Sequence, residues 1–413
     1  MKQALANPAI RRILAAAAVS QIGDWAARLA VAFVVLDETG LASGVSVVAV
    51  LFFLPWLGPG QLLASFGDRM PRVRLLVGSE LTRAALYAAI ALAASTGAPV
   101  WILLTGVALV AVIDPVWEAN RSALLVDVAS DDEYAPAQKF VTSVNQASTL
   151  VGWALGGVLV AAVGTVGTLW FNAGSFVVSA MFVGGISVPK DSERPHRSGS
   201  LRAAVRFLRS DRVSLIAIVT TVGLTIPGMG IETQAPVFGR EAGLADQWIG
   251  VLAAMVPAVT LLGVLLIPHR RPDAQLLSMS FGVSAVALVG AAVAFSFRSV
   301  AILAFVGYAA VGVPFAASTA ANIVVGRRLP GSDRASVFVV VQTAVFAALS
   351  IGAIVGGPIS DLAGSVFANI SLAIVGAVIC GVGGILTFSH GNLAPSERVV
   401  SNFTRNRKSP FHD

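Results

Sequence analysis

The sequence predicts an all-α membrane protein in which twelve transmembrane helices form two pseudo-symmetric bundles of six. Three observations support this fold class. Hydrophobic residues make up 56% of the 413 residues, charged residues make up only 12%, and the mean hydropathy is +0.82. The apolar residues occur in long runs, and two motifs recur after about 200 residues. Length alone would suggest two or three soluble domains, but a chain this apolar is expected to be integral to a membrane.

The apolar runs define the expected helices in order. Each run is about 20 to 25 residues long, and a helix of that length crosses about 30 Å of hydrocarbon at 1.5 Å per residue. The connection between the second and third spans carries several charges and must lie in water, because burial of its charge in lipid would cost several kcal/mol. The twelve predicted spans are 11–35, 44–66, 73–94, 100–122, 136–163, 167–187, 213–237, 247–268, 274–295, 299–325, 335–360 and 364–388.

The positions of the basic residues predict the orientation of the chain. If the N-terminus is cytoplasmic, every Lys and Arg falls on the cytoplasmic side except Arg240 and Arg298, which fall outside, and Arg28 and Arg83, which fall within helices. Positively charged loops remain on the cytoplasmic side of a membrane. We therefore expect a multi-pass protein of the cell membrane, inner or plasma, with both termini cytoplasmic. This asymmetry accounts for the net charge of +6 without a nucleic-acid partner.

The longest polar interruption divides the chain. We predict two six-helix bundles over residues 1–188 and 213–390, a cytoplasmic linker over 189–212 and a cytoplasmic tail over 391–413. The linker carries apolar residues at helical spacing, which predicts a short amphipathic helix on the membrane surface. These residues are Leu201, Ala204, Val205 and Leu208.

Two motifs repeat between the halves. Pro71 begins the sequence PRVRLL, and Pro272 begins PDAQLL 201 positions later. A G-x-x-x-G-G motif in the fifth span recurs in the eleventh, 200 positions on; its glycines are Gly152, Gly156, Gly157, Gly352, Gly356 and Gly357. Glycines at this spacing leave a helix face without side chains, so that a partner helix can approach closely and slide, although ordinary tight packing would use the same motif. Six-helix repeats around a central site are a common transporter architecture.

A charged loop between the second and third spans is a candidate cytoplasmic gate. Asp68, Arg69 and Arg72 lie within it, and Arg72 could pair with Glu118 or Asp127 at the cytoplasmic end of the fourth span. Ion pairs that form in one state and break in another are typical of a gate. The alternative is that the loop acts only as a topology signal.

Six ionisable residues fall within the predicted spans: Asp24, Arg28, Glu80, Arg83, Asp114 and Glu232. Such residues are functional candidates because they are costly in lipid. We interpret Glu80 and Arg83, three positions apart, as a structural ion pair. We assign Asp24, Trp25, Arg28, Asp114 and Glu232 to proton coupling and the substrate cavity. Burial of the three carboxyl groups among them disfavours their charged form and prepares them to take up a proton.

These motifs resemble the major facilitator superfamily over about residues 10–390, in the branch of twelve-helix exporters that includes siderophore and multidrug efflux proteins. The loop signature G-x-x-x-D-R-x-G-R-R of that family appears as Ala64, Asp68, Arg69, Pro71, Arg72 and Val73. Its antiporter signature G-P-x-x-G-G appears as Gly152, Trp153, Gly156 and Gly157, with tryptophan in place of proline. The triplet Gly23, Asp24 and Trp25 is also similar to this branch. The resemblance implies the major facilitator fold and proton antiport.

The sequence therefore predicts a transporter and not an enzyme. It contains no nucleotide-binding loop, catalytic triad or metal-ligand spacing, so we expect no cofactor and no metal, and the energy must come from a gradient. The expected partners are a small lipophilic or cationic substrate, protons and membrane lipid, and the expected oligomeric state is a monomer. Siderophore export and lysophospholipid transport are alternatives. A non-transporting scaffold or sensor is disfavoured, because the longest loop has only about 24 residues.

Overall fold

The computed structural model describes residues 5–57, 71–187, 211–268, 271–297, 300–329 and 334–391. Asp68 and Arg69, the predicted linker helix and most of the predicted tail lie outside these residues. The first half contains α2 (Pro8–Thr39), α3 (Ala42–Phe53), the short 3-10 helix η1 (Leu54–Leu57), α5 (Arg72–Ser95), α6 (Val100–Val128) and α7 (Asp131–Gly184). The second half contains α9 (Arg212–Thr233), α10 (Ala235–Glu241), α11 (Asp246–Leu266), α12 (Asp273–Ser296), α13 (Ala301–Arg328), α14 (Arg334–Ala363) and α15 (Ser365–Gly391).

The predicted fold class is confirmed, because the described chain consists of long apolar helices. Within the described residues, ten helices are long and apolar enough to cross a membrane. One of them, α7, covers two predicted spans, which meet at Gly164 with φ 74° and ψ 174°. Residues with a side chain rarely adopt that backbone conformation, whereas glycine adopts it readily. The chain can therefore reverse at this glycine without a loop. The segment of α3 and η1 is described only as far as Leu57. The count of twelve helices stays a prediction.

The seventh predicted span differs from the structure. We predicted one helix over 213–237 with a bend at its Pro/Gly-rich stretch, but α9 continues through Pro227 and ends at Thr233, where Gln234 turns the chain into α10. The break follows from Pro236, which has no backbone N–H to donate to the carbonyl of Glu232 four residues earlier. Glu232 consequently occupies the last turn of α9, beside a change of helix direction.

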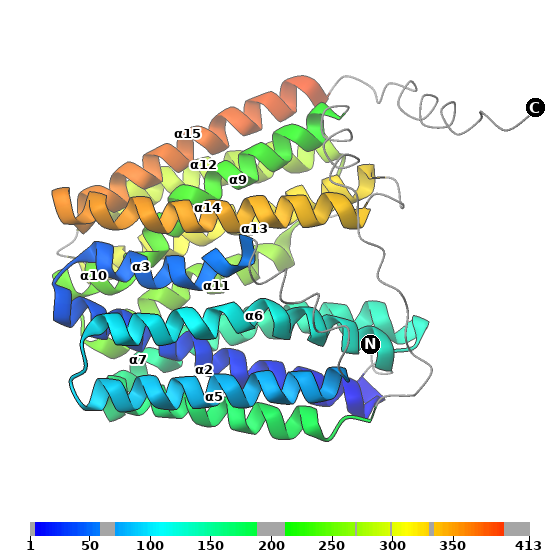
Figure 1. Cartoon of the computed structure of the whole chain (residues 1–413). Helices are drawn as coiled ribbons and strands as arrows, with labels where there is room; N and C mark the ends of the chain where they lie inside the picture. Colours follow the sequence, from blue (N-terminus) through cyan, green and yellow to red (C-terminus); the bar gives the residue numbers. More distant parts are fainter. Residues whose placement is uncertain are drawn as a thin grey trace, which may run out of the picture.

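The two halves pack internally and meet along two helix pairs. In the first half α2 packs against α7, and in the second half α9 packs against α14 and α15. The halves meet where α3 lies against α14 and where α7 lies against α11. Figure 1 shows α3 beside α14. The largest apolar core cluster contains residues from both halves.

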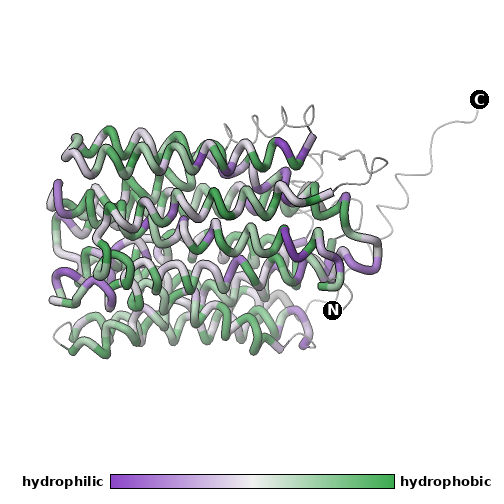
Figure 2. Tube along the Cα trace, turned by 90° about the horizontal axis from the view of Figure 1, so that it is seen from below, coloured by the Kyte–Doolittle hydropathy of each residue, from purple (hydrophilic) through white to green (hydrophobic). Residues whose placement is uncertain are grey.

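The helices run between two ends of the molecule. We call one the Asn7 end, where α2, α5, α9 and α12 begin, and the other the Asp361 end, where α2 and α14 finish and α3 begins. Figure 2 shows apolar residues along the body of the helices and hydrophilic residues concentrated near both ends. This pattern is the one expected of a protein that spans a bilayer.

Candidate functional site

The repeated glycines make two kinds of contact: with helices of the same half and with helices of the other half. A methyl group placed at Gly156 would stand 2.9 Å from the Cα of Ala26 on α2, within the same half, and Gly152 likewise faces α2. At Gly157, by contrast, the methyl group would stand 2.8 Å from the Cα of Gly250 on α11, in the other half. The third glycine therefore serves the interface between the halves.

The second motif repeats this division. Gly352 and Gly356 face α9 in their own half, and a methyl group at Gly356 would stand 3.0 Å from the Cα of Gly230. A methyl group at Gly357 would stand 2.6 Å from the Cα of Ser43 on α3, across the interface. Both predicted packing motifs thus bring the halves into backbone contact through their last glycine.

Polar contacts also join the halves at the Asp361 end. Arg240 on α10 donates to Asp37 on α2 over 3.1 Å and lies 4.8 Å above the ring of Phe33. Gln234 donates to the hydroxyl of Ser46 on α3 over 3.4 Å. These contacts and the contacts of Gly157 and Gly357 join the two halves at this end.

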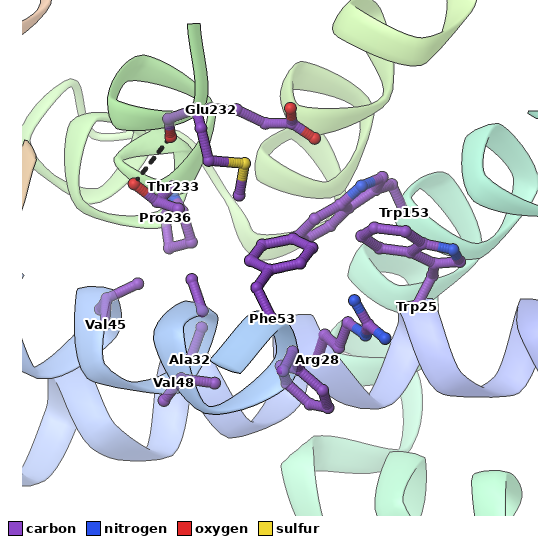
Figure 3. A pocket seen from close by; sticks show the side chains of 13 residues that line it. Trp25, Arg28, Ala32, Val45, Val48, Phe53, Trp153, Glu232, Thr233 and Pro236 are labelled. Carbon is purple, nitrogen blue, oxygen red and sulfur yellow. Dashed lines mark hydrogen bonds between the residues drawn. The ribbon is translucent and has the colours of Figure 1, made fainter. Parts of the chain in front are cut away.

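A cavity lies between the halves and encloses about 440 Å³ of empty space, part of it open to the surroundings. Its walls come from α2, α3, α7, α9 and α10 and are mostly apolar. The lining residues are Trp25, Arg28, Ala32, Val45, Val48, Ala49, Phe52, Phe53, Trp153, Met229, Glu232, Thr233 and Pro236. In the view of Figure 3, the rings of Trp25, Trp153 and Phe53 group between the Glu232 carboxylate and the Arg28 guanidinium.

The arginine that lines this cavity forms an ion pair and contacts two aromatic rings. Arg28 donates from Nη2 and Nε to Oδ2 of Asp24, over 2.9 Å and 3.2 Å. Its guanidinium lies 4.3 Å from the ring centre of Trp25 and 4.0 Å from that of Phe52, within the range of cation–π contacts. Asp24 does not line the cavity itself; it lies behind Arg28 and neutralises it.

Glu232 also lines the cavity, but its contacts differ from those of Arg28. Among the residues that the structure describes, none donates a hydrogen bond to its carboxylate or forms an ion pair with it. An unpaired carboxylate surrounded by aromatic rings is a suitable partner for a cationic, apolar compound.

A network of charges lies behind Asp24 in the first half. Tyr87 donates to Oδ1 of Asp24 over 3.1 Å. Arg83 pairs with Glu80 over 2.9 Å and with Asp114 over 3.2 Å, and Ser179 donates to Glu80 over 2.7 Å. Asp114 is not among the residues that line the described cavity, because its carboxylate turns to Arg83 instead.

The described part of the predicted gate lies at the Asn7 end. Arg72, the first residue of α5, pairs with Asp127 near the end of α6 and also donates to the carbonyl of Ala123 over 3.4 Å. Glu118 accepts from Arg121 on its own helix over 3.1 Å, so it is not the partner of Arg72.

Sequence reasoning missed several residues of the site. Trp153 appeared only as a departure from a motif, yet it lines the cavity and its ring centre lies 5.4 Å from that of Trp25. The pair of Asp273 and Arg328, 2.9 Å apart, is the counterpart of Arg72 and Asp127 in the second half. The repeat offset of 201 residues relates both positions to the first pair and would have found it.

Two bundles of apolar helices that meet around a cavity with ionisable walls define a membrane transporter. The sequence model of the Major Facilitator Superfamily matches residues 13–353, and the chain belongs to this family. The predicted family is thereby confirmed.

The relatives and the solved structures agree with this assignment. The chain is 24% identical to the uncharacterized MFS-type transporter YfiS of Bacillus subtilis, with 94% of each chain covered. It is 25% identical to the multidrug efflux pump Tap of Mycobacterium tuberculosis strain H37Rv, with 88% of this chain and 90% of Tap covered.

Among solved structures, a bacterial homologue of the lysosomal transporter Spinster, inward-facing and unoccupied, matches with a TM-score of 0.72 at 14% identity, over 94% of this chain and 99% of that one. An inward-facing bacterial homologue of the iron transporter ferroportin matches with a TM-score of 0.67 at 16% identity, over 91% of this chain and 98% of that one. At these identities the likeness concerns the fold.

Proposed function

We propose that this protein is a secondary active exporter of small lipophilic or cationic compounds, driven by proton antiport and working by alternating access. The observation that carries the proposal is the Glu232 carboxylate, which lies in an aromatic cavity between the two halves and has no hydrogen bond or ion pair among the described residues. The multidrug efflux pump Tap, a relative at 25% identity, adds weak support for drug efflux. We further propose that the protein acts as a monomer in the cell membrane. The distribution of its basic residues supports an orientation with both termini cytoplasmic.

In this proposal Glu232 binds the cationic group of the substrate. Arg28 does not compete with the substrate for Glu232 as an ion-pair partner, because Arg28 is already paired with Asp24. The rings of Trp25, Trp153 and Phe53 provide flat apolar surfaces for the rest of the molecule. A cation over an aromatic face gains about 0.5–2 kcal/mol in such an environment, so charge and ring contacts reinforce each other.

The proton is assigned to the charge network of the first half. Asp24, Glu80 and Asp114 bring three carboxyl groups together with only two arginines, Arg28 and Arg83. If every group were ionised, the network would keep one unbalanced negative charge in a membrane-embedded setting, which is costly. One bound proton would balance it, and Asp24, which contacts Arg28 at the cavity wall, links that proton to the substrate.

The test is substrate-dependent proton flux in liposomes that contain the purified protein, screened with ethidium, a siderophore and a lysophospholipid. We expect ethidium to drive proton movement and Glu232→Gln to reduce the apparent affinity for ethidium. Glu38→Gln, which removes an exposed carboxylate outside the cavity, is the control. Proton flux with the siderophore or the lysophospholipid alone would replace the proposed substrate class. Absence of flux with all three would contradict proton-coupled export of these compounds.

A further inference from the structure

A carboxylate of the second half caps a helix of the first half at the Asp361 end. Oδ1 of Asp361, near the end of α14, accepts from the backbone N–H of Ala42 over 2.6 Å. Oδ2 accepts from the N–H of Ser43 over 3.0 Å. These donors are the first two helical residues of α3, and they are 319 and 318 positions away in the chain.

The cap comes from the opposite half because α3 has none of its own. The first N–H groups of a helix have no partner within the helix, and a Ser, Thr, Asp or Asn at the preceding position usually accepts from them. In α3 that position is Leu41, whose side chain makes no capping hydrogen bond. A negative charge here also complements the positive end of the helix dipole. Asp361 therefore performs for α3 the role that an N-cap residue performs locally in other helices.

The second interface between the halves lacks this device. In the repeat, Asp361 corresponds to Ala161 on α7, at the offset of 200 residues that relates the glycine motifs. The helix that faces α7 is α11. The carboxylate in the first turn of α11 comes from Asp246 of that helix, and it pairs with Arg240 over 3.3 Å. An alanine side chain has no hydrogen-bond acceptor, so among the described residues a side chain from the opposite half caps the helix at the α3–α14 interface but not at the α7–α11 interface.

We propose that Asp361 is a latch that holds the two halves together at the Asp361 end and that must release α3 before the cavity can open there. The cavity lies directly behind it, because Val45, Val48 and Phe52 of α3 line its wall. Gly357, one turn before Asp361, brings the backbones of α14 and α3 close enough for the carboxylate to reach. Asp361 is itself exposed, so separation of the halves at this end would chiefly break both hydrogen bonds and leave the Ala42 and Ser43 N–H groups without this acceptor.

The test measures the conformational equilibrium directly and needs no substrate. In a background with Cys380→Ala, spin labels are placed on Ser95→Cys and Ser296→Cys, exposed positions of opposite halves at the Asp361 end. A second protein carries labels on Arg74→Cys and Gln275→Cys, exposed positions at the Asn7 end. In Asp361→Ala, we expect the ratio of open to closed conformers to rise about fivefold at the Asp361 end, the size of a lost helix cap. The distances at the Asn7 end should shorten in the same variant.

Two further variants keep the test decisive. Ala42→Pro removes one of the two donors while leaving the carboxylate intact, and proline is tolerated at the first position of a helix; it should move the distances in the same direction. Glu38→Ala deletes an exposed carboxylate at the same end that has no hydrogen bond or ion pair among the described residues, and it should change nothing. Unchanged distributions in both Asp361→Ala and Ala42→Pro, or lengthening at both ends together, would overturn the latch.

Discussion

At the scale of single residues, the structure shows that Asp24 and Glu232 differ in their polar contacts, a difference that the sequence alone could not reveal. Asp24 is engaged by Arg28 and Tyr87, whereas Glu232 has no polar partner in the described structure. A paired carboxylate can exchange a proton by changing its partner, while an unpaired one can bind a foreign cation. Each role predicts a different defect.

Replacement of Asp24 should uncouple transport from the proton gradient. Asp24→Asn keeps the size of the side chain but fixes a neutral state, so pH-driven export should fall at least tenfold while downhill exchange of substrate continues. Both activities are measured in the same liposomes with and without a pH gradient. Tyr87→Phe, which removes a donor to Asp24 without removing the carboxylate, should retain pH-driven export.

Two results for Asp24→Asn would speak against this role. Full pH-driven export would remove Asp24 from the coupling mechanism. Loss of folded protein would instead indicate that Asp24 is needed to neutralise Arg28, because an unpaired buried charge is strongly destabilising.

At the scale of helices, each half joins equivalent helix ends by an ion pair, and the positions of the cation and the anion are exchanged between the halves. In the first half the cation Arg72 begins α5 and the anion Asp127 lies near the end of α6. In the second half the anion Asp273 begins α12 and the cation Arg328 ends α13. Only the second arrangement complements the helix dipoles, which favour anions at the beginning of a helix and cations at its end.

The charges of the first pair should therefore be exchangeable. Arg72→Asp and Asp127→Arg should each destabilise the protein by about 1–3 kcal/mol, because each places like charges together. The double variant should recover the stability of the parent protein, since the pair is restored with favourable dipole interactions. Thermal unfolding in detergent measures all four proteins. A double variant whose loss equals the sum of the single losses would show that the pair contributes no coupling.

The glycines of α7 should also differ in their tolerance to alanine. Gly157→Ala adds a methyl group against the backbone of Gly250 in the other half, so the halves must separate and transport should decrease. Gly174→Ala is the matched control, because no atom lies within 4 Å of the added methyl group. Spin-label distances at the Asp361 end should lengthen in the first variant and stay constant in the second. Equal distances in both would assign Gly157 to ordinary packing.

At the scale of the whole molecule, the described helices and the distribution of basic residues predict one orientation in the membrane. Ser95 and Leu362 lie exposed at the Asp361 end, and Gln275 lies exposed at the Asn7 end. Cysteines at the first two positions, in a background with Cys380→Ala, should react with an impermeant reagent in intact cells. A cysteine at Gln275 should react only after the cells are permeabilised, and the reverse pattern would invert the predicted orientation.

Hydropathy and the internal repeat were sufficient to predict the fold. Long apolar runs must be helices in lipid, because every backbone polar group needs a partner within the segment. The predicted spans 136–163 and 167–187 place the break at Gly164 correctly, whereas the break at Gln234 was missed. The second break depends on the N–H that Pro236 lacks, while Pro227, the more conspicuous signal, leaves α9 continuous.

The sequence by itself determined that this protein is a helical membrane transporter, which residues carry charge inside the membrane, and that its halves are related. Tertiary structure alone decided how those charges are used. It paired Asp114 with Arg83, left Glu232 open to the cavity, placed Trp153 in the cavity wall and brought Asp361 to the beginning of α3. The physical reason is distance along the chain: hydropathy and helix length are local, whereas each of these contacts joins helices from separate parts of the sequence and exists only after they pack.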